Sequence, residues 1–247
     1  MSVLRQIVSA FGFRRVISLC RDLAQLFIAK KSGTAWTRLI PQHSLKPELS
    51  DSQILRSIEF VSFATKVDLS DISIRSLSKS HLEYLNFWPG EHYKLLRGVS
   101  EVMKPKLVVE IGTWVGMSAL ALSKFAEKTI TYDVRQWDSF KKTFLLAEDF
   151  EHKIEQRVGN LLEDKFFNLQ IEIFKDADLI FLDAPKDGNF EQKLLSKILP
   201  LLKSESILIL DDIKFINMLD IWEKLEFPRI DLSSFGHSSG TGIVFIP

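Results

Sequence analysis

Acidic and amide side chains follow several short apolar runs from residue 107 onward in this 247-residue chain. The runs are rich in Val, Ile and Leu, which is typical of strands buried on both faces of a parallel sheet. Ligands of such sheets bind beyond the carboxyl ends of the strands, where carboxylates can accept hydroxyl hydrogen bonds or coordinate hard cations. The polar residues at those ends are the candidate site residues: Glu110, Asp133, Asn160, Asp183, Asp211 and Asp212.

A glycine turn follows the first of these runs. Residues 107–111 lead into Gly112 and Gly116, and Ala119 and Leu120 then begin a sequence of high helix propensity. Glycine lets the backbone turn sharply and lets a ligand approach it closely. The N–H groups at the start of a helix also favour an anionic group there. The pattern predicts a ligand-binding loop, and an ordinary strand-to-helix connection is the alternative.

Asp133 ends the next apolar run, about twenty residues after the glycine turn, as the acid does in dinucleotide sites. A carboxylate at this place can accept hydrogen bonds from both ribose hydroxyls of a nucleoside. The spacing Gly112-x-x-x-Gly116 differs from the G-x-G-x-x-G of dinucleotide folds, which disfavours a dehydrogenase.

With Glu110 before it, the glycine turn resembles the first motif of the class I S-adenosylmethionine-dependent methyltransferases. The resemblance extends from about residue 85 to the end of the chain and implies S-adenosylmethionine as the cofactor. Asn160 lies where this family contacts the adenine, although Gly159-Asn160 is also an ordinary turn sequence. The cofactor-binding residues that the resemblance implies are Glu110, Gly112, Thr113, Trp114, Gly116, Ser118, Asp133, Asn160 and Asp183.

The next two strand ends resemble the metal-dependent O-methyltransferases of the catechol and caffeoyl-coenzyme A type. There an Asp, with a Lys three residues later, closes one strand and an Asp-Asn pair closes the next. The resemblance implies that Asp183, Asp211 and Asp212 bind Mg²⁺ or Ca²⁺, and that Lys186 is the general base beside Asp183. Asp212 departs from this pattern, and the acidic pair is closer to metal-dependent sugar O-methyltransferases. The alternative is that both acids cap a helix beginning near Lys214.

The resemblance implies an O-methyltransferase acting on a small hydroxylated acceptor, sugar or catechol-like. Two alternatives stay open, a metal-independent methyltransferase of the same fold and a non-catalytic S-adenosylmethionine-binding module. Lys186 stands where amino methyltransferases acting on bases and amides carry an aromatic residue, which argues against a nucleic-acid substrate. A formal net charge of zero also argues against a general nucleic-acid binder.

The alternation of strand-like and helix-like segments predicts a doubly wound α/β domain over residues 85–247, with seven strands. Residues 229–233 and 243–246 predict a final antiparallel pair. The parallel strands are expected near 107–111, 129–133, 155–158, 178–182 and 206–210. The helices are expected near 92–103, 116–126, 137–149, 189–200 and 214–224.

Residues 1–84 predict a helical extension. The first fifty residues hold eight basic and two acidic side chains, and an apolar stripe runs from Val16 to Phe27 at helical spacing. Packing on the protein or on a second copy, as in a homodimer, is favoured over binding to an anionic membrane. The sequence Ser50–Gln53 predicts the start of a further helix through about Phe63.

Two features bear on the compartment. Cys20 is the single cysteine, so an internal disulfide is excluded, and a reducing compartment fits. No apolar run is long enough to cross a bilayer, and Arg5, Arg14 and Arg15 interrupt any signal-peptide core. We expect a cytoplasmic protein without a transmembrane segment.

Overall fold

The computed structural model describes residues 47–75, 85, 92–236 and 239–247, all within a compact unit that spans Lys46–Pro247. The amphipathic stretch from Val16 to Phe27, with the homodimer contact predicted for it, lies outside the described residues. Of the helices in the described part of the chain, none combines the length and the apolar character needed to span a bilayer.

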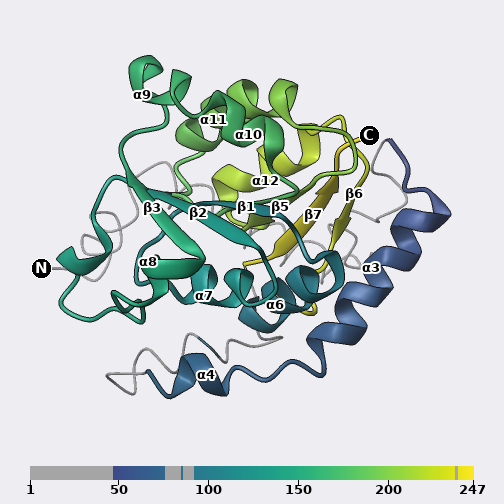
Figure 1. The fold of residues 1–247 in the computed structure, drawn as a ribbon. Coiled ribbons are helices and arrows are strands. Elements are labelled where there is room, and N and C mark those ends of the chain that lie inside the picture. The colour runs from purple at the N-terminus through teal and green to yellow at the C-terminus, as the bar shows by residue number, and fades with distance from the viewer. Residues whose placement is uncertain (1–46, 76–84, 86–91, 237–238) are drawn as a thin grey trace, which may run out of the picture. The chain divides into compact units, whose positions relative to one another are not determined.

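A seven-stranded sheet in the order β3-β2-β1-β4-β5-β7-β6 forms the centre of this unit (Figure 1). Its first five strands are parallel, and β7 runs antiparallel to both β5 and β6, so the predicted fold class is confirmed. The strands are β1 (Leu107–Ile111), β2 (Lys128–Asp133), β3 (Ile154–Val158), β4 (Leu179–Leu182), β5 (Ile207–Asp211), β6 (Arg229–Asp231) and β7 (Thr241–Phe245).

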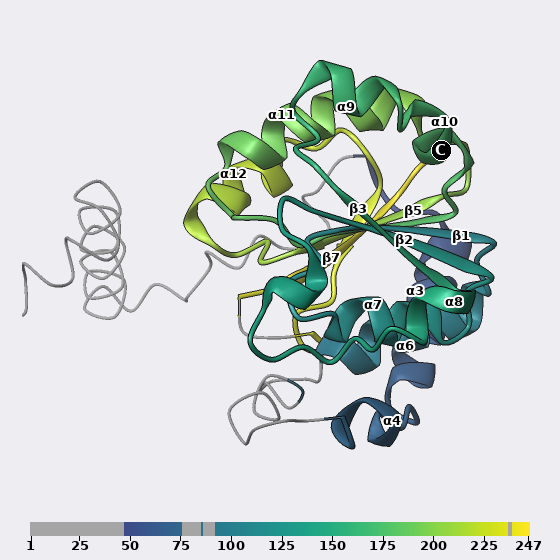
Figure 2. The ribbon, with the colours of Figure 1, turned by 60° about the vertical axis from the view of Figure 1, so that its left-hand side comes forward.

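Helices cover both faces of the sheet (Figure 2). One face carries α3 (Asp51–Ala64), α6 (His92–Met103), α7 (Met117–Ser123) and α8 (Asp149–His152), with α4 (Ser70–Ser73) packed against α7. The other face carries α9 (Asp164–Asn168), α10 (Ile171–Asp176), α11 (Asn189–Ile198) and α12 (Ile216–Lys224). Two short 3-10 turns, η2 (Trp137–Ser139) and η3 (Leu199–Leu201), complete the described elements.

The central strands are buried along their whole length, as their unbroken apolar sequences predict. All residues of β4 and β5 are buried, and Phe181 and Ile209 belong to the main hydrophobic core. The capping box predicted at the start of α3 is also present: Gln53 donates its N–H to the Ser50 hydroxyl, and Ser50 donates its own to the Gln53 side chain.

The helix predicted near residues 137–149 is wrong. The segment begins with the short η2 turn and continues as an irregular loop over residues 140–148 up to α8. This loop packs onto the glycine turn and does not form a helix. Phe144 donates its N–H to the Val115 carbonyl at 2.9 Å, and the Thr143 hydroxyl donates to the same oxygen at 3.2 Å. Phe144 and Leu145 are buried, so their apolar character reflects this tertiary contact and not a helical face.

The register of the sheet brings the candidate strand ends to one edge. Ile111 lies opposite Tyr132 in β2 and Leu182 in β4, and Leu182 lies opposite Leu210 in β5. The chain passes from β1 to β2 and β3 on one side of β1, and then to β4 and β5 on its other side. The carboxyl ends of β1 and β4 therefore flank the switch point, where ligands bind in doubly wound sheets.

Candidate active site

The glycine turn leaves no room for side chains at its two glycines. Gly112 has φ +107°, and a Cβ there would lie 1.9 Å from the Asp183 carbonyl oxygen. Gly116 has φ +85°, and its Cβ would lie 2.2 Å from Leu145 Cγ. Glycine is needed at both positions for backbone conformation and for close packing, as the sequence pattern predicted.

Asp133 is joined to the glycine turn through the backbone. Its Oδ2 accepts the Trp114 N–H at 2.9 Å, and its Oδ1 accepts the Arg135 N–H at 3.0 Å. The buried Thr113 hydroxyl lies 2.6 Å from that of Thr131, which fixes β1 against β2. Each carboxylate oxygen can accept a second hydrogen bond, so Asp133 keeps acceptor capacity for a hydroxylated ligand.

Three non-glycine residues at these strand ends have left-handed backbone conformations. Trp114 has φ +42°, Lys186 has φ +60° and Asp212 has φ +58°, and they follow β1, β4 and β5 respectively. Such conformations are costly for residues with a Cβ, and they cluster at functional sites. The surrounding structure thus holds each of these side chains in a fixed direction at one edge of the sheet.

Glu110 is completely buried at the end of β1. Burial raises the pKa of its carboxyl from its ordinary value of 4.5 to about 8, although the nearby Ser118 and Thr131 hydroxyls favour the charged form. Among the described residues, no hydrogen-bond donor meets either carboxylate oxygen with good geometry. A cationic group brought to this place by a ligand would pair with the carboxylate.

The pKa of Glu110 predicts a pH dependence of folding stability. The folded state holds the Glu110 proton up to about pH 8, whereas the unfolded chain loses it near 4.5. The folded state therefore binds more protons between these values, so the free energy of unfolding should fall as pH rises from about 4.5 to about 8. Urea unfolding across this range tests the expectation. Glu110→Gln should flatten this part of the profile, and an unchanged slope in that variant would contradict the assignment.

Lys186 lies among three carboxylates. Its Nζ is 2.9 Å from Asp212 Oδ2 and 3.3 Å from Asp211 Oδ2, and it also forms an ion pair with Asp183. Burial alone would lower the pKa of Lys186, but attraction to Asp183, Asp211 and Asp212 raises it well above the ordinary value of 10.5. Burial, with repulsion from Asp211, raises the pKa of Asp183 to about 6.

This geometry disagrees with two roles implied by the resemblance. The three predicted metal ligands do converge, but on the Lys186 ammonium, and no group of three or more His, Cys, Asp or Glu side chains in the described chain is arranged to hold a metal. As placed, these residues do not fit a divalent cation. The ammonium also has no lone pair, so Lys186 is not ready to act as the general base.

Two residues that the sequence did not single out hold the backbone of Lys186. The buried Glu191 carboxylate accepts the N–H of Lys186 at 2.7 Å and that of Gly188 at 2.9 Å. Asn217 Nδ2 donates to the Lys186 carbonyl at 3.2 Å. Glu191 lies in the first turn of α11, and the spacing Gly188-x-x-Glu191 is a helix-start signal that could have identified it.

Glu191→Gln is expected to lower the free energy of unfolding by about 1–3 kcal/mol, because a neutral amide oxygen can replace only part of these charge-assisted bonds. It should also lower turnover more than it changes cofactor affinity, since the Lys186 loop loses its support. Urea unfolding and steady-state kinetics measure the two effects. Glu172→Gln is the matched control, because Glu172 is exposed and forms a surface ion pair with Lys175. Equal effects of the two substitutions would exclude the positioning role.

Tyr93, in the first turn of α6, also faces this edge of the sheet. The ring is buried, and burial together with the Asp183, Asp211 and Glu110 carboxylates raises the pKa of its hydroxyl. The sequence predicted the helix that carries it but not this residue. Asn160 accepts the Leu162 N–H at 3.0 Å and so forms a local turn, and its adenine contact stays a prediction.

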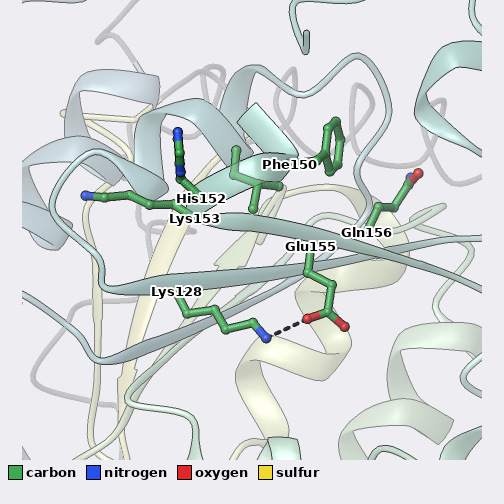
Figure 3. A pocket seen from close by; sticks show the side chains of 7 residues that line it. Lys128, Phe150, His152, Lys153, Glu155 and Gln156 are labelled. Carbon is green, nitrogen blue, oxygen red and sulfur yellow. Dashed lines mark ion pairs between the residues drawn. The ribbon is translucent and has the colours of Figure 1, made fainter. Parts of the chain in front are cut away.

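A hollow of about 330 Å³ lies elsewhere (Figure 3). Lys128 begins β2 and Ile154 begins β3, so this hollow is at the amino ends of the strands, away from the candidate site. A 2.5 Å ion pair joins Lys128 to Glu155 across it. The hollow contains none of the predicted site residues. Its lining residues are Lys128, Phe150, His152, Lys153, Ile154, Glu155 and Gln156.

Comparison with known proteins agrees with this geometry. Residues 109–213 match a family described as a methyltransferase domain. These residues are therefore similar to a methyltransferase domain. The matched segment runs from β1 to just beyond β5, so it contains the glycine turn, Asp133 and the Lys186 cluster, which consists of Lys186, Asp183, Asp211 and Asp212.

Two solved structures share the fold of this chain. A candidate caffeoyl-CoA O-methyltransferase from Staphylococcus aureus is 18% identical, with a TM-score of 0.55, and the alignment covers 78% of this chain and 100% of that one. A methyltransferase from Geobacter sulfurreducens is 13% identical, with a TM-score of 0.52, over 80% of this chain and 99% of that one. A search of curated protein sequences found no match.

Proposed function

We propose that this protein is an S-adenosylmethionine-dependent O-methyltransferase that methylates a hydroxyl group of a small acceptor. The observation that carries the proposal is the grouping of the glycine turn, Asp133 and the Lys186 cluster at one edge of a methyltransferase domain. The glycine turn and Asp133 suit a nucleoside, and the Lys186 cluster suits a reacting hydroxyl. The methyl donor and the acceptor hydroxyl would therefore meet between the ends of β1 and β4.

The cofactor would lie along the glycine turn. Asp133 would accept the ribose hydroxyls, and Glu110 lies where the cationic amino group of the methionine part could pair with it. Trp114, which is 43% exposed, would cover one side of the cofactor. The turn and the loop over residues 143–145 pack together, so the two segments would support the cofactor as one unit.

S-adenosylmethionine supplies the methyl group from its sulfonium. The acceptor oxygen would receive this methyl group as the carbon–sulfur bond breaks, with S-adenosylhomocysteine as the leaving group. Of the three carboxylates, Asp183 has the most exposed side chain, at 31% against 5% for Asp211 and 16% for Asp212, so we assign it to receive the hydroxyl proton. The Lys186 ammonium would stabilise negative charge as it develops on the oxygen.

The charges of the cluster restrict the acceptor. Three carboxylates and one ammonium leave an excess of negative charge when all are ionised, and this repels anionic groups. The same side chains offer both hydrogen-bond donors and acceptors to neighbouring hydroxyls. A neutral ring with more than one hydroxyl, either catechol-like or a sugar, therefore fits best.

Asp133→Ala tests cofactor binding. The substitution removes charge-assisted hydrogen bonds to the ribose, so the affinity for S-adenosylhomocysteine should fall about ten- to a hundredfold in calorimetry. Asp138→Ala is the control, because Asp138 is exposed in η2 and should leave the affinity unchanged. Equal affinity of the Asp133→Ala variant and the unaltered protein would contradict the ribose contact.

A further inference from the structure

We infer that the Lys186 ammonium takes the place of a divalent cation, so that this methyltransferase works without a metal. The inference rests on the proposed function, because it concerns the group that meets the acceptor oxygen. It departs from the metal-dependent enzymes that the sequence resembles, although the three positions of their metal ligands have counterparts here in Asp183, Asp211 and Asp212.

The contacts of Lys186 match its hydrogen-bonding capacity. An ammonium has three N–H donors, and three carboxylates surround this one: Asp183, Asp211 at 3.3 Å and Asp212 at 2.9 Å. A divalent cation at the same point would need the same oxygens. The two cations therefore compete for one position.

Other parts of the chain also fix the backbone of Lys186. Its backbone N–H is bound to Glu191, its carbonyl accepts a hydrogen bond from Asn217, and its φ of +60° directs the side chain inward. The side chain is only 14% exposed. Lys186 is therefore no mobile surface lysine, and a metal could enter only by displacing it from three ion pairs at once.

The negative charge of Asp212 favours an ammonium at this position. The resembling catechol-type enzymes have a neutral Asn at this position, whereas here a third carboxylate gives the ammonium a third anionic partner, at 2.9 Å. A single positive charge attracts the acceptor oxygen less strongly than a divalent ion does. The methyltransferase would therefore depend on Asp183 to accept the proton, and chelators should leave its turnover unchanged.

Titration with Mn²⁺ alone, followed by electron paramagnetic resonance of the free ion, tests the inference without any substrate. The full-length protein, freed of metals by chelation, should show no saturable Mn²⁺ binding below about 1 mM, the weak end of protein divalent-ion sites. Lys186→Met removes the ammonium at similar side-chain volume, and it should create one Mn²⁺ site. Lys203→Met is the matched control, because Lys203 pairs with the single carboxylate of Asp178 and its loss should create no site.

Saturable Mn²⁺ binding by the unaltered protein would overturn the inference, and so would the absence of a new site in Lys186→Met. Circular dichroism checks the folding of that variant, and Lys186→Gln replaces it if it does not fold. Calorimetry with S-adenosylhomocysteine on the same samples tests the proposed function separately. Failure to bind this nucleoside would count against the methyltransferase proposal, whereas the Mn²⁺ result decides the role of Lys186.

Discussion

Lys186→Ala is expected to lower turnover about 10²–10³-fold, the range observed when one stabilising donor is removed from a developing oxyanion. The affinity for S-adenosylhomocysteine should change little, because the glycine turn and Asp133 hold that ligand. The assay is methyl transfer at saturating cofactor in the presence of a chelator. The chelator matters because the substitution vacates a position that a metal from the buffer could fill.

Lys203→Ala provides the control for this loss. Among the described residues Lys203 has one ion pair, with Asp178, and it lies just before the amino end of β5, whereas the cluster lies at the carboxyl ends of β4 and β5. Its removal should leave turnover unchanged. Turnover of Lys186→Ala within threefold of the control, about 0.7 kcal/mol in activation free energy, would show that the ammonium does not stabilise the transition state.

Gly112→Ala should lower the free energy of unfolding by roughly 2–5 kcal/mol, from overpacking and from the positive φ together. The added Cβ would lie 1.9 Å from the Asp183 carbonyl oxygen, and this backbone atom cannot move aside as a side chain can. Separation of β1 from β4 would also disturb the position of Asp183. We therefore expect weak cofactor binding and loss of turnover even where the variant folds.

Gly159→Ala is the comparison for this effect. Its Cβ would also be crowded, at 2.6 Å, but by the Phe166 ring, which is a side chain and can shift. The stability loss should be clearly smaller than that of Gly112→Ala in the same urea titration. A loss at residue 112 that does not exceed the loss at residue 159 would mean that the contact between the β1 and β4 ends is not a critical constraint.

The sequence predicts the sheet and its polar edge because both depend on short-range patterns. Unbroken apolar runs such as those of β4 and β5 predict buried strands, and parallel strands necessarily bring their carboxyl ends together. Asp133 and the glycine turn are therefore found correctly as neighbours. The confirmed capping box at Ser50 has the same origin, since its two partners are only three residues apart.

The geometry around Lys186 is not predictable in this way. Its direction depends on a left-handed backbone and on hydrogen bonds with Glu191 and Asn217. The spacing Gly188-x-x-Glu191 indicates a helix start, but nothing in the sequence connects Glu191, Asn217 or the left-handed backbone with the Lys186 side chain. The same limit explains the wrong helix near residues 137–149. Leu145 there is buried by its contact with Gly116, a distant neighbour that periodicity cannot reveal.

Methyl transfer from deuterium-labelled S-adenosylmethionine tests the central claim most directly. The full-length protein, kept in chelator, is incubated with a panel of catechols and neutral sugars, and the products are measured by mass spectrometry. We predict that S-adenosylhomocysteine and an O-methylated acceptor carrying the label form in equal amounts. Tight binding of S-adenosylhomocysteine with no labelled product from any hydroxylated acceptor would contradict the claim, and it would favour a non-catalytic cofactor-binding module.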